Sequence, residues 1–326
     1  MKKGFTLVEV MAAIIVLSIV SIIAIPRIMD TIERSRYKSF YIEENKAIKA
    51  ASEYFNQNSG LLYNIGDAAS VSINTLISEG KLKEIQFYGD TCGGYILGSK
   101  VKENEVIYTS HINCKSTVNS LSEDDLIGYF NLDNNIYNLA NPGGVSTQHG
   151  NISFGEDKFE NNKRALYLDG SAQSYILSDV TRPTTTLSIC AWINPDILPS
   201  ERMTIVQGVV SSSYYLSLHS NGAINSYWYD TSSPGYHSTP ASIVNVGEWT
   251  HACTTWDGTS NRIYVNGSLE NTRATSGIGR NTTRVNIGAA SSARRFIGFI
   301  DDVYIYDRTL SDEEIMFMYK KRLLRG

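Results

Sequence analysis

The feature that most constrains this chain is a predominantly apolar stretch of 21 residues close to its start, from Phe5 to Ile25. Its only charged residue is Glu9. A helix of about 20 apolar residues can cross the hydrocarbon layer of a membrane, so the stretch predicts one transmembrane segment at residues 5–25. Lys2 and Lys3 precede it, and positive charge on that side favours a cytoplasmic N-terminus.

A cleaved secretory signal is the alternative explanation of this stretch. A signal has a shorter apolar core and a cleavage site with small residues at two places. Here Ile22-Ile23-Ala24 lacks the first small residue, and the helical pattern continues beyond it. The sequence therefore favours a segment that stays attached.

Beyond Pro26 the pattern becomes amphipathic. Apolar residues recur at a period near 3.6 from Ile28 to about Phe55, with charged residues between them, which predicts a helix with one buried face. A continuous helix from Phe5 to Phe55 would be about 75 Å long at about 1.5 Å per residue. Pro26 would bend it, because proline lacks the backbone donor and clashes with the preceding turn.

Glu9 suggests what the apolar segment does. A carboxylate in the middle of a membrane costs about 2.5–3.5 kcal/mol by insertion scales, so such a group usually faces a partner. Cleavage between Gly4 and Phe5 would create an amino group one helical turn from Glu9. A neighbouring copy could present that amine to Glu9 inside a bundle of apolar helices, which predicts assembly.

The segment Lys2-Lys3-Gly4-Phe5-Thr6-Leu7-Val8-Glu9-Val10, with the apolar run and Pro26, resembles the start of type IV pilins and pseudopilins. The resemblance implies that a prepilin peptidase removes a leader of residues 1–4 by cleavage after Gly4, and that the new amino group of Phe5 is N-methylated. It assigns Glu9 to assembly with other pilin subunits through their N-terminal helices, and Pro26 to a kink.

The same resemblance implies a location. The protein would sit in the bacterial cytoplasmic membrane by a single span before assembly, and in an extracellular pilus or at the cell surface afterwards. A plain membrane anchor is the alternative.

Residues 58–120 have the pattern of a small α+β unit that follows the long helix of residues 5–57. Ser72–Glu79 predicts a short helix, and three segments predict a small antiparallel sheet: Gln86–Tyr88, Tyr95–Val101 and Glu105–Ile112. Pilin headgroups often pack such a sheet on the exposed half of the helix. We expect a disulfide between Cys92 and Cys114, with two unpaired thiols as the alternative.

From residue 125 to about residue 320 strand patterns follow one another and helical patterns nearly vanish. Turn signals such as Asn221-Gly222 separate them, and Ser311 with Glu314 predicts a capping box that opens a terminal helix. About 195 residues of this kind predict a two-sheet sandwich. The clearest strands are Leu187–Ile193, Tyr214–His219, Ala223–Tyr229, Trp249–Trp256, Arg262–Val265 and Phe296–Tyr306.

Several motifs follow one another in this segment: Leu126–Phe130, Ala165–Gly170, Leu187–Trp192, Glu248–Asp257, Tyr264–Gly267 and Phe299–Tyr306. Their order and spacing are similar to the concanavalin-type jelly rolls of laminin-G and pentraxin domains. The resemblance implies a disulfide between Cys190 and Cys253, with buried reduced cysteines as the alternative. The expected architecture is an α+β pilin unit, with a long N-terminal helix and a small antiparallel sheet, followed by an all-β jelly-roll sandwich.

The chain lacks the patterns of an enzyme. A glycosidase needs two carboxyl groups about 5–10 Å apart, but Asp301 and Asp302 are adjacent and so face opposite sides of a strand. The sequence also has no nucleophile elbow, metalloprotease helix or phosphate loop. With 29 basic and 33 acidic residues the net charge is −4, so no nucleic-acid partner is expected either.

The jelly-roll resemblance implies a structural calcium ion with Asp169 and Asp302 as ligands, because calcium prefers oxygen donors. Hydrogen bonds from these carboxylates to the backbone are the alternative. No other cofactor is expected.

Four aromatic residues are candidates for ligand binding: Tyr227, Trp228, Tyr229 and Tyr236. Exposed aromatic faces suit a glycan. Strand alternation sends Trp228 to the opposite face from Tyr227 and Tyr229, so at least one set is expected in the core.

We therefore expect a minor or tip subunit of a type IV pilus that displays the sandwich as an adhesive module for a glycan or a host- or cell-surface protein. The alternative is a pseudopilin of a type II secretion or DNA-uptake system. A surface enzyme is the third and least supported alternative.

Overall fold

The computed structural model describes residues 11, 32, 35–36, 39–87, 89–114, 125–141, 143–158, 162–171, 174–182, 186–209, 214–228, 236–275, 282–289 and 294–323. The predicted processing and assembly residues Gly4, Phe5, Glu9 and Pro26 lie outside them. Within the described residues, no helix combines the length and apolar character needed to cross a membrane.

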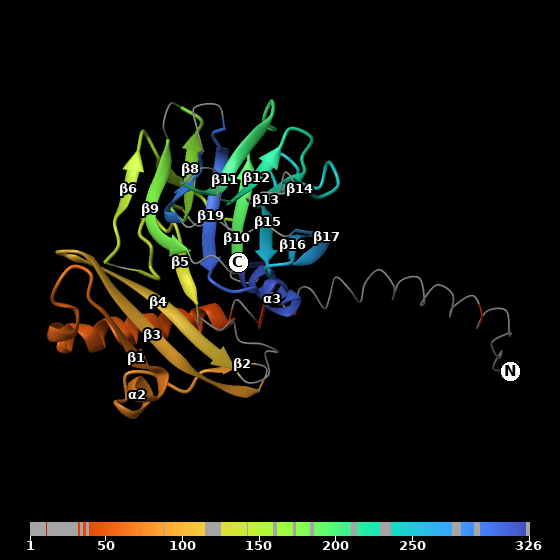
Figure 1. Cartoon of the computed structure of the whole chain (residues 1–326). Helices are drawn as coiled ribbons and strands as arrows, with labels where there is room; N and C mark the ends of the chain where they lie inside the picture. The colour runs from red at the N-terminus through yellow and green to blue at the C-terminus, as the bar shows by residue number, and fades with distance from the viewer. Residues whose placement is uncertain are drawn as a thin grey trace, which may run out of the picture.

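The N-terminal unit packs one helix, over residues 39–57, against a four-stranded antiparallel sheet (Figure 1). The helix ends at residue 57, where the long N-terminal helix was expected to end. In the sheet, β3 lies between β1 and β2 and also pairs with β4. The other elements are η1 Ser59–Leu62, β1 Ala68–Ser72, α2 Ile73–Ser78, β2 Gln86–Phe87, β3 Asp90–Lys102 and β4 Glu105–Cys114.

The helix buries one side against the sheet because small and apolar residues recur every four positions. Ala47, Ala51 and Phe55 are buried along that side. Gly98 on β3 allows the close approach, since a Cβ atom there would lie 3.2 Å from the Phe55 ring. The expected packing of a small sheet on the helix is thus present.

The sandwich consists of two antiparallel sheets with a shared core (Figure 1). Sheet I has the order β17-β16-β15-β10-β19-β8-β7, and β5 also pairs with β19. Its strands are β5 Leu126–Phe130, β7 Ser153–Gly155, β8 Ala165–Asp169, β10 Leu187–Pro195, β15 Thr250–Trp256, β16 Ser260–Val265, β17 Ser268–Ala274 and β19 Ile297–Tyr306.

Sheet II has the order β14-β13-β12-β11-β18-β9-β6. Its strands are β6 Ser146–His149, β9 Tyr175–Arg182, β11 Arg202–Gly208, β12 Tyr214–His219, β13 Ile224–Trp228, β14 Tyr236–Ser238 and β18 Thr282–Ile287. The helix α3, Asp312–Leu323, follows the last strand. The C-terminal region is therefore the expected all-β, jelly-roll-like sandwich.

The core lies between the two sheets and includes a small polar link. Most of its members are aliphatic, as the strand alternation predicts. Ser226 of sheet II shares a hydrogen bond of 2.7 Å with Thr254 of sheet I, and Asn261 donates to the same serine hydroxyl at 2.9 Å. Each of these buried polar groups has a hydrogen-bond partner, so burying them costs little free energy. The hydrogen bonds also fix the position of one sheet relative to the other.

Both expected disulfides are present. Cys92 and Cys114 are register partners on β3 and β4, and Cys190 and Cys253 are register partners on β10 and β15. In both pairs the Cα atoms are 4.1 Å apart. Each disulfide therefore joins two neighbouring strands of one sheet.

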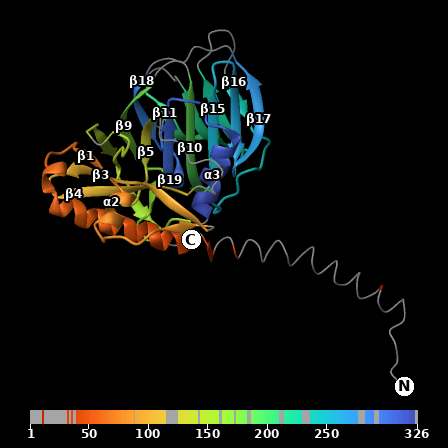
Figure 2. The same ribbon diagram turned by 90° about the horizontal axis from the view of Figure 1, so that it is seen from below.

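The two units contact each other through the start of the sandwich (Figures 1 and 2). The Arg164 guanidinium donates to the Tyr41 hydroxyl of the N-terminal helix at 2.9 Å and lies 3.9 Å from the Asp133 carboxylate. A Cβ atom on Gly66 would lie 3.2 Å from the Gly143 Cα atom. The sandwich thus rests directly on the N-terminal unit.

Candidate ligand-binding face

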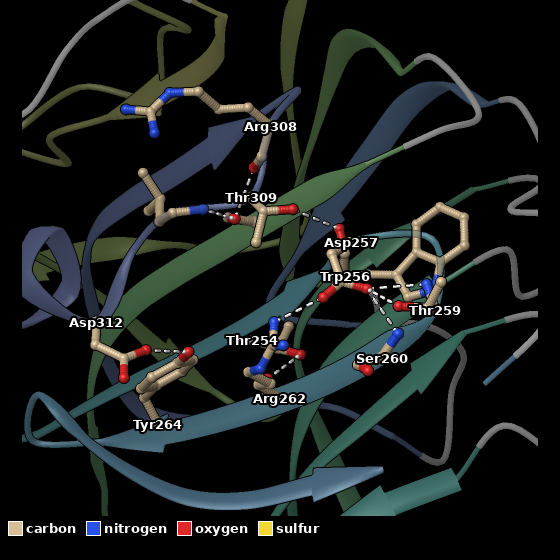
Figure 3. Close-up of polar contacts among 12 residues, drawn as sticks. Thr254, Trp256, Asp257, Thr259, Ser260, Arg262, Tyr264, Arg308, Thr309 and Asp312 are labelled. Atoms are coloured by element: carbon tan, nitrogen blue, oxygen red, sulfur yellow. Dashed lines mark hydrogen bonds and ion pairs between the residues drawn. The ribbon is translucent and has the colours of Figure 1, made fainter. Parts of the chain in front are cut away.

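Part of the outer face of sheet I is covered by α3, as Figure 2 shows. Strand residues Cys190, Cys253, Tyr264 and Tyr306 pack with helix-side residues into a second apolar cluster that includes Leu310, Ile315 and Met318. The Tyr264 hydroxyl donates to the Asp312 carboxylate at 2.7 Å (Figure 3). Burial and this hydrogen bond raise the pKa of Tyr264. This part of sheet I is core rather than a surface open to a ligand.

The start of α3 has the predicted capping box. The Ser311 amide donates to the Glu314 carboxylate at 2.9 Å, and the Glu314 amide donates to the Ser311 hydroxyl at 3.2 Å. Arg308 also donates to Glu314 through both terminal nitrogens, at 2.9 and 2.6 Å. Burial raises the pKa of Glu314, but these hydrogen bonds outweigh it and leave the pKa below its ordinary value.

Asp257, the last residue of the Glu248–Asp257 motif, stabilises the fold. One Asp257 carboxylate oxygen accepts from the Thr259 and Ser260 amides at 2.9 and 2.7 Å, and the other accepts from Arg262 at 2.8 Å (Figure 3). The pKa of Asp257 is lowered because these donors outweigh its burial. The carboxylate therefore fastens the turn between β15 and β16.

The two predicted calcium ligands do not meet. Asp169 is exposed at the end of β8 and is the register partner of Ile297 on β19. Asp302 lies on β19, five residues beyond Ile297. At about 3.3 Å per residue this places Asp302 roughly 16 Å from the position that Asp169 faces. The Asp169 carboxylate accepts from the Ser171 amide at 2.8 Å. The prediction of one site formed by Asp169 and Asp302 is therefore wrong, because β19 places them far apart along its length.

Among the described residues, one group has ligating atoms close enough to hold a metal ion, namely Cys190, His251 and Cys253. The two sulfur atoms are already bonded to each other. His251 is fully buried beside Trp192, and its burial lowers its pKa to about 3. A neutral imidazole beside a disulfide is part of the covered core and offers no thiolate to a metal.

The outer face of sheet II is lined by polar and aromatic residues. Leu216 and Leu218 of β12 point into the core, so Tyr215 and Ser217 point outward. Across the sheet, two rows of register partners result. One row is Gln207, Tyr215, Tyr227 and Tyr236, and the other is Thr204, Ser217, Asn225 and Ser238.

An arginine and two tyrosines stack on this face. The Tyr215 and Tyr227 rings are 5.0 Å apart with an interplanar angle of 11°. The guanidinium carbon of Arg202 lies 4.1 Å from the centre of the Tyr215 ring, and the guanidinium also donates to the Tyr215 hydroxyl. A cation on a tyrosine face is attracted by the ring quadrupole, and the stack is largely closed, since Tyr215 is 3% exposed and Arg202 is half-buried.

The Arg202 side chain crosses the row of small polar residues to reach Tyr215. Arg202 is the partner of His219, and Thr204 and Ser217 form the next row before Tyr215. Thr204 and Ser217 are 1% and 0% exposed although they point outward, and Gln207 and Asn225 are 9% and 8% exposed, so this part of the outer face is closed. The Ser217 hydroxyl has no hydrogen-bond partner among the described residues.

The four predicted ligand residues have different places. Tyr227 points outward and is half-buried, whereas Trp228 is 1% exposed in the core, where its ring stacks 5.2 Å from that of Trp256. The prediction that Trp228 binds ligand is therefore wrong, because alternation turns it inward. Tyr229 lies outside the described residues, and Tyr236 is described through its backbone pairing with Tyr227.

Sequence reasoning missed Arg202, Ser217 and the row of polar residues. The sequence places Tyr215 on the strand before β13, close to the predicted aromatic residues. Arg202, however, is 13 residues away from Tyr215 in sequence. The pairing of β11 with β12 brings them together. A search for polar residues at alternate positions of β12 and β13 would have found Ser217 and Asn225.

Comparisons with known proteins recognise both parts of the chain. Residues 1–25 match the model of the prokaryotic N-terminal methylation motif, and residues 168–316 match that of the concanavalin A-like lectin/glucanases superfamily. No curated protein matches the chain.

Solved structures with a similar fold include receptor-binding domains of botulinum neurotoxins. The serotype D ligand-binding domain, solved with N-acetylneuraminic acid, is 17% identical, with a TM-score of 0.50 over 63% of this chain and 52% of that chain. The C/D mosaic domain is 16% identical, with a TM-score of 0.50 over 63% and 53%. This chain thus spans about half the length of these structures, and at such identity they share the fold alone.

The fold and these matches define a concanavalin-like jelly-roll domain of the laminin-G type. The chain joins this domain to the N-terminal methylation motif of type IV pilins. Both parts point to a non-catalytic protein.

Proposed function

We propose that this chain is a minor or tip subunit of a type IV pilus, which displays the sandwich on the cell surface as a binding module. The observation that carries the proposal is the methylation motif at residues 1–25, placed ahead of a disulfide-bonded sandwich. Disulfides persist in oxidising compartments outside the cytoplasm, where a pilus subunit would place its sandwich.

In this proposal the N-terminal segment assembles the filament. A prepilin peptidase cleaves after Gly4 and methylates the amino group of Phe5. The segment from Phe5 to Ile25 lies in the cytoplasmic membrane before assembly and in the filament core afterwards, with Pro26 as its bend. Glu9 pairs with the amino group of a neighbouring subunit, which removes the cost of an isolated carboxylate among apolar helices.

The contact between the two units supports display of the sandwich. The N-terminal unit meets residues near the start of the sandwich, such as Arg164 and Gly143. In sheet II, β12 is three strands away from β9, roughly 14 Å at about 4.8 Å per strand. Strand β12 therefore lies away from the contact with the N-terminal helix over residues 39–57.

The test is mass spectrometry of the mature N-terminus in filaments sheared from intact cells, comparing the wild type with Glu9→Ala. We expect N-methylated Phe5 in the wild-type filament fraction. Glu9→Ala should be cleaved and remain in the membrane but be lost from filaments by at least tenfold, because its amine partner is gone. Ser18→Ala, in the same apolar segment, is the control and should enter filaments normally.

Other outcomes would separate the alternatives. A processed protein that is absent from sheared filaments, together with a secretion or DNA-uptake defect when the gene is deleted, would identify a pseudopilin. An intact Met1 would contradict both pilin functions and leave a membrane-anchored sandwich.

A further inference from the structure

We propose that the part of the outer face of sheet I that α3 leaves open binds an arginine-bearing segment of another protein. The inference rests on the proposed function, because it names the partner class of the displayed sandwich. The site lies toward the C-terminal ends of β8 and β10. Strand β8 begins beside Arg164, which contacts the N-terminal helix, and ends at Asp169. The site is therefore directed away from the N-terminal unit.

The centre of the site is a row of three aromatic rings. Tyr167 on β8 and Phe299 on β19 are register partners, and their ring centres are 4.8 Å apart. The centre of the Trp249 ring lies 6.1 Å from that of Phe299. Leu166 and Ile300 point into the core, so alternation turns their neighbours Tyr167 and Phe299 outward. All three rings are half-buried, whereas the other three tryptophans of the chain are at most 2% exposed.

The next row of the same sheet already holds a cation on aromatic rings. Trp192 is the register partner of Asp301, which lies two residues beyond Phe299. The Lys158 ammonium lies 4.1 Å from the centre of the Trp192 ring and 5.9 Å from that of Tyr319. Among the described residues, no cation lies over the three rings of the open row. A ring face attracts a cation through its quadrupole, so the open row can take one from a partner.

Carboxylates without a cationic partner border the rings. Asp169, Asp196 and Glu248 are exposed, and each accepts hydrogen bonds from neutral groups. No basic side chain of the described residues lies within ion-pair distance of them, and the nearby Arg295 donates to a backbone carbonyl at 3.1 Å. The pKa of Tyr167 is raised, first by its hydrogen bond to Asp196, then by burial and by the charges of Asp196 and Asp169. Unpaired carboxylates around a ring attract a cation.

A guanidinium fits this row better than an ammonium does. It is planar, so it stacks on aromatic rings, and it has five N–H donors and no acceptor. The row offers mainly acceptors. Besides the carboxylates, it contains the side-chain oxygen of Asn194, which has no hydrogen-bond partner among the described residues. Asn194 is the register partner of Phe299, and a rotation of its amide would present this oxygen to a donor above the row.

Apolar side chains beside the row indicate that the arginine belongs to a protein segment. Ile197 and Val246 are 47% and 48% exposed. The Gly247 amide donates to the Pro195 carbonyl at 2.9 Å, which holds their two loops together. A free cation would leave these side chains in water, whereas a segment with an apolar residue next to its arginine would cover them. The carboxylates also disfavour an anionic membrane surface as the partner.

The test uses the full chain, purified in detergent, and the capped peptide Leu-Arg-Gly-Arg-Leu. One matched peptide has citrulline in place of both arginines, and another has glycine in place of both leucines. Calorimetry should show the arginine peptide binding about tenfold more tightly than the citrulline peptide and severalfold more tightly than the glycine peptide. Binding should change the tryptophan fluorescence of the wild type but not that of Trp249→Phe, because the other tryptophans are buried.

Three variants test the named groups. Asp196→Asn should weaken binding about tenfold, because it removes the charge and keeps an acceptor for the Tyr167 hydroxyl. Trp249→Leu should lose severalfold, whereas Trp249→Phe keeps a ring and should retain binding. The matched control is Glu313→Gln, which removes one charge from an exposed position at the start of α3. It should leave binding unchanged, and thermal unfolding should show that every variant is folded.

Several outcomes would overturn the inference. These are equal binding of the citrulline peptide, binding of free arginine amide as tight as that of the peptide, unchanged binding in Asp196→Asn, and an equal loss in Glu313→Gln. Failure of the proposed function gives a different result. If N-methylated protein is present in filaments but the arginine peptide does not bind, the pilus function stands and the partner is wrong. If the peptide binds through Asp196 but Met1 is intact, the partner stands and the pilus function is wrong.

Discussion

The two outer faces of the sandwich begin from the same strand pattern and end with different roles. On sheet I, Tyr264 and Tyr306 point outward and are almost fully buried. On sheet II, Tyr215 and Tyr227 also point outward and stack with Arg202, and Tyr215 is 3% exposed whereas Tyr227 is half-buried. In both sheets alternation decides which residues leave the core between the sheets.

The two faces differ in what covers them. Helix α3 lies on sheet I and turns part of its outer face into a second core, with Ile315 at 0% exposure and Met318 at 6%. Burial raises the pKa of Tyr306 well above its ordinary value on this face. The comparison teaches that an outward-facing aromatic residue is a binding candidate only if no other part of the chain packs over it.

The largest expected effect comes from the disulfide under α3. Replacing Cys190 and Cys253 together by alanine should lower the free energy of unfolding of the sandwich by about 4 kcal/mol in the loop-entropy model, because the bond closes a sequence separation of 63 residues. All four tryptophans lie between residues 192 and 256. Their fluorescence in a urea titration therefore reports the sandwich alone.

The control is the other disulfide. Replacing Cys92 and Cys114 by alanine should destabilise the N-terminal unit by about 3 kcal/mol and leave the tryptophan transition in place, since that bond spans 22 residues outside the sandwich. If both pairs shifted the tryptophan transition equally, the two units would unfold as one.

The second prediction breaks the cover itself. Ile315→Ala should destabilise the sandwich by about 3 kcal/mol, because it leaves a cavity between α3 and sheet I. Leu269→Ala removes a similar side chain from β17, where Leu269 is 45% exposed, and should change stability by less than about 0.5 kcal/mol. The same urea titration compares them. Equal small effects would mean that α3 is not part of the fold that covers sheet I.

The third and smallest effect is pH-dependent and concerns the start of α3. Glu314→Ala should cost about 1–2 kcal/mol at pH 7, because it removes charge-assisted hydrogen bonds from Arg308 and Ser311. Glu313→Ala, an exposed neighbour in the same helical turn, should cost less and serves as the control. Thermal unfolding across a pH series is the measurement.

The sign of that dependence follows from the lowered pKa of Glu314. A carboxyl whose pKa is lower in the folded state stabilises the protein above its ordinary pKa, near 4.5, and loses the contribution as pH falls through the folded value. The difference between the wild type and Glu314→Ala should therefore be full at pH 7 and disappear in acid. A difference that grew on acidification would contradict the assignment.

Much of the fold was predictable from local patterns. The capping box at Ser311 and Glu314 placed the start of α3, and alternation placed strands such as β12, β13 and β19. Strands β1, β6, β7, β9, β14, β17 and β18 were missed. Strands β1, β6, β7 and β14 are short, and β17 and β18 are mostly polar. Strand β11 was missed partly because a register irregularity between Thr204 and Val206 interrupts its alternation.

The candidate site was less predictable than the fold. Tyr227 was found from its strand, but the arginine that completes the stack belongs to β11, and nothing in the sequence near Arg202 indicates its partner. The predicted calcium pair failed for the opposite reason. Asp169 and Asp302 each occupy the expected motif, but the pairing of β8 with β19 sets them far apart.

The sequence by itself determined the properties that depend on neighbouring residues. These are the apolar segment with Glu9, the methylation motif, the side of each strand that faces the core, and the capped start of α3. Only the tertiary structure decided which outward faces are covered and which distant residues meet. Sheet order and the docking of α3 depend on contacts between residues far apart in the chain, and no local pattern records them. Sheet I is therefore partly closed by α3, and Arg202 reaches Tyr215 on sheet II.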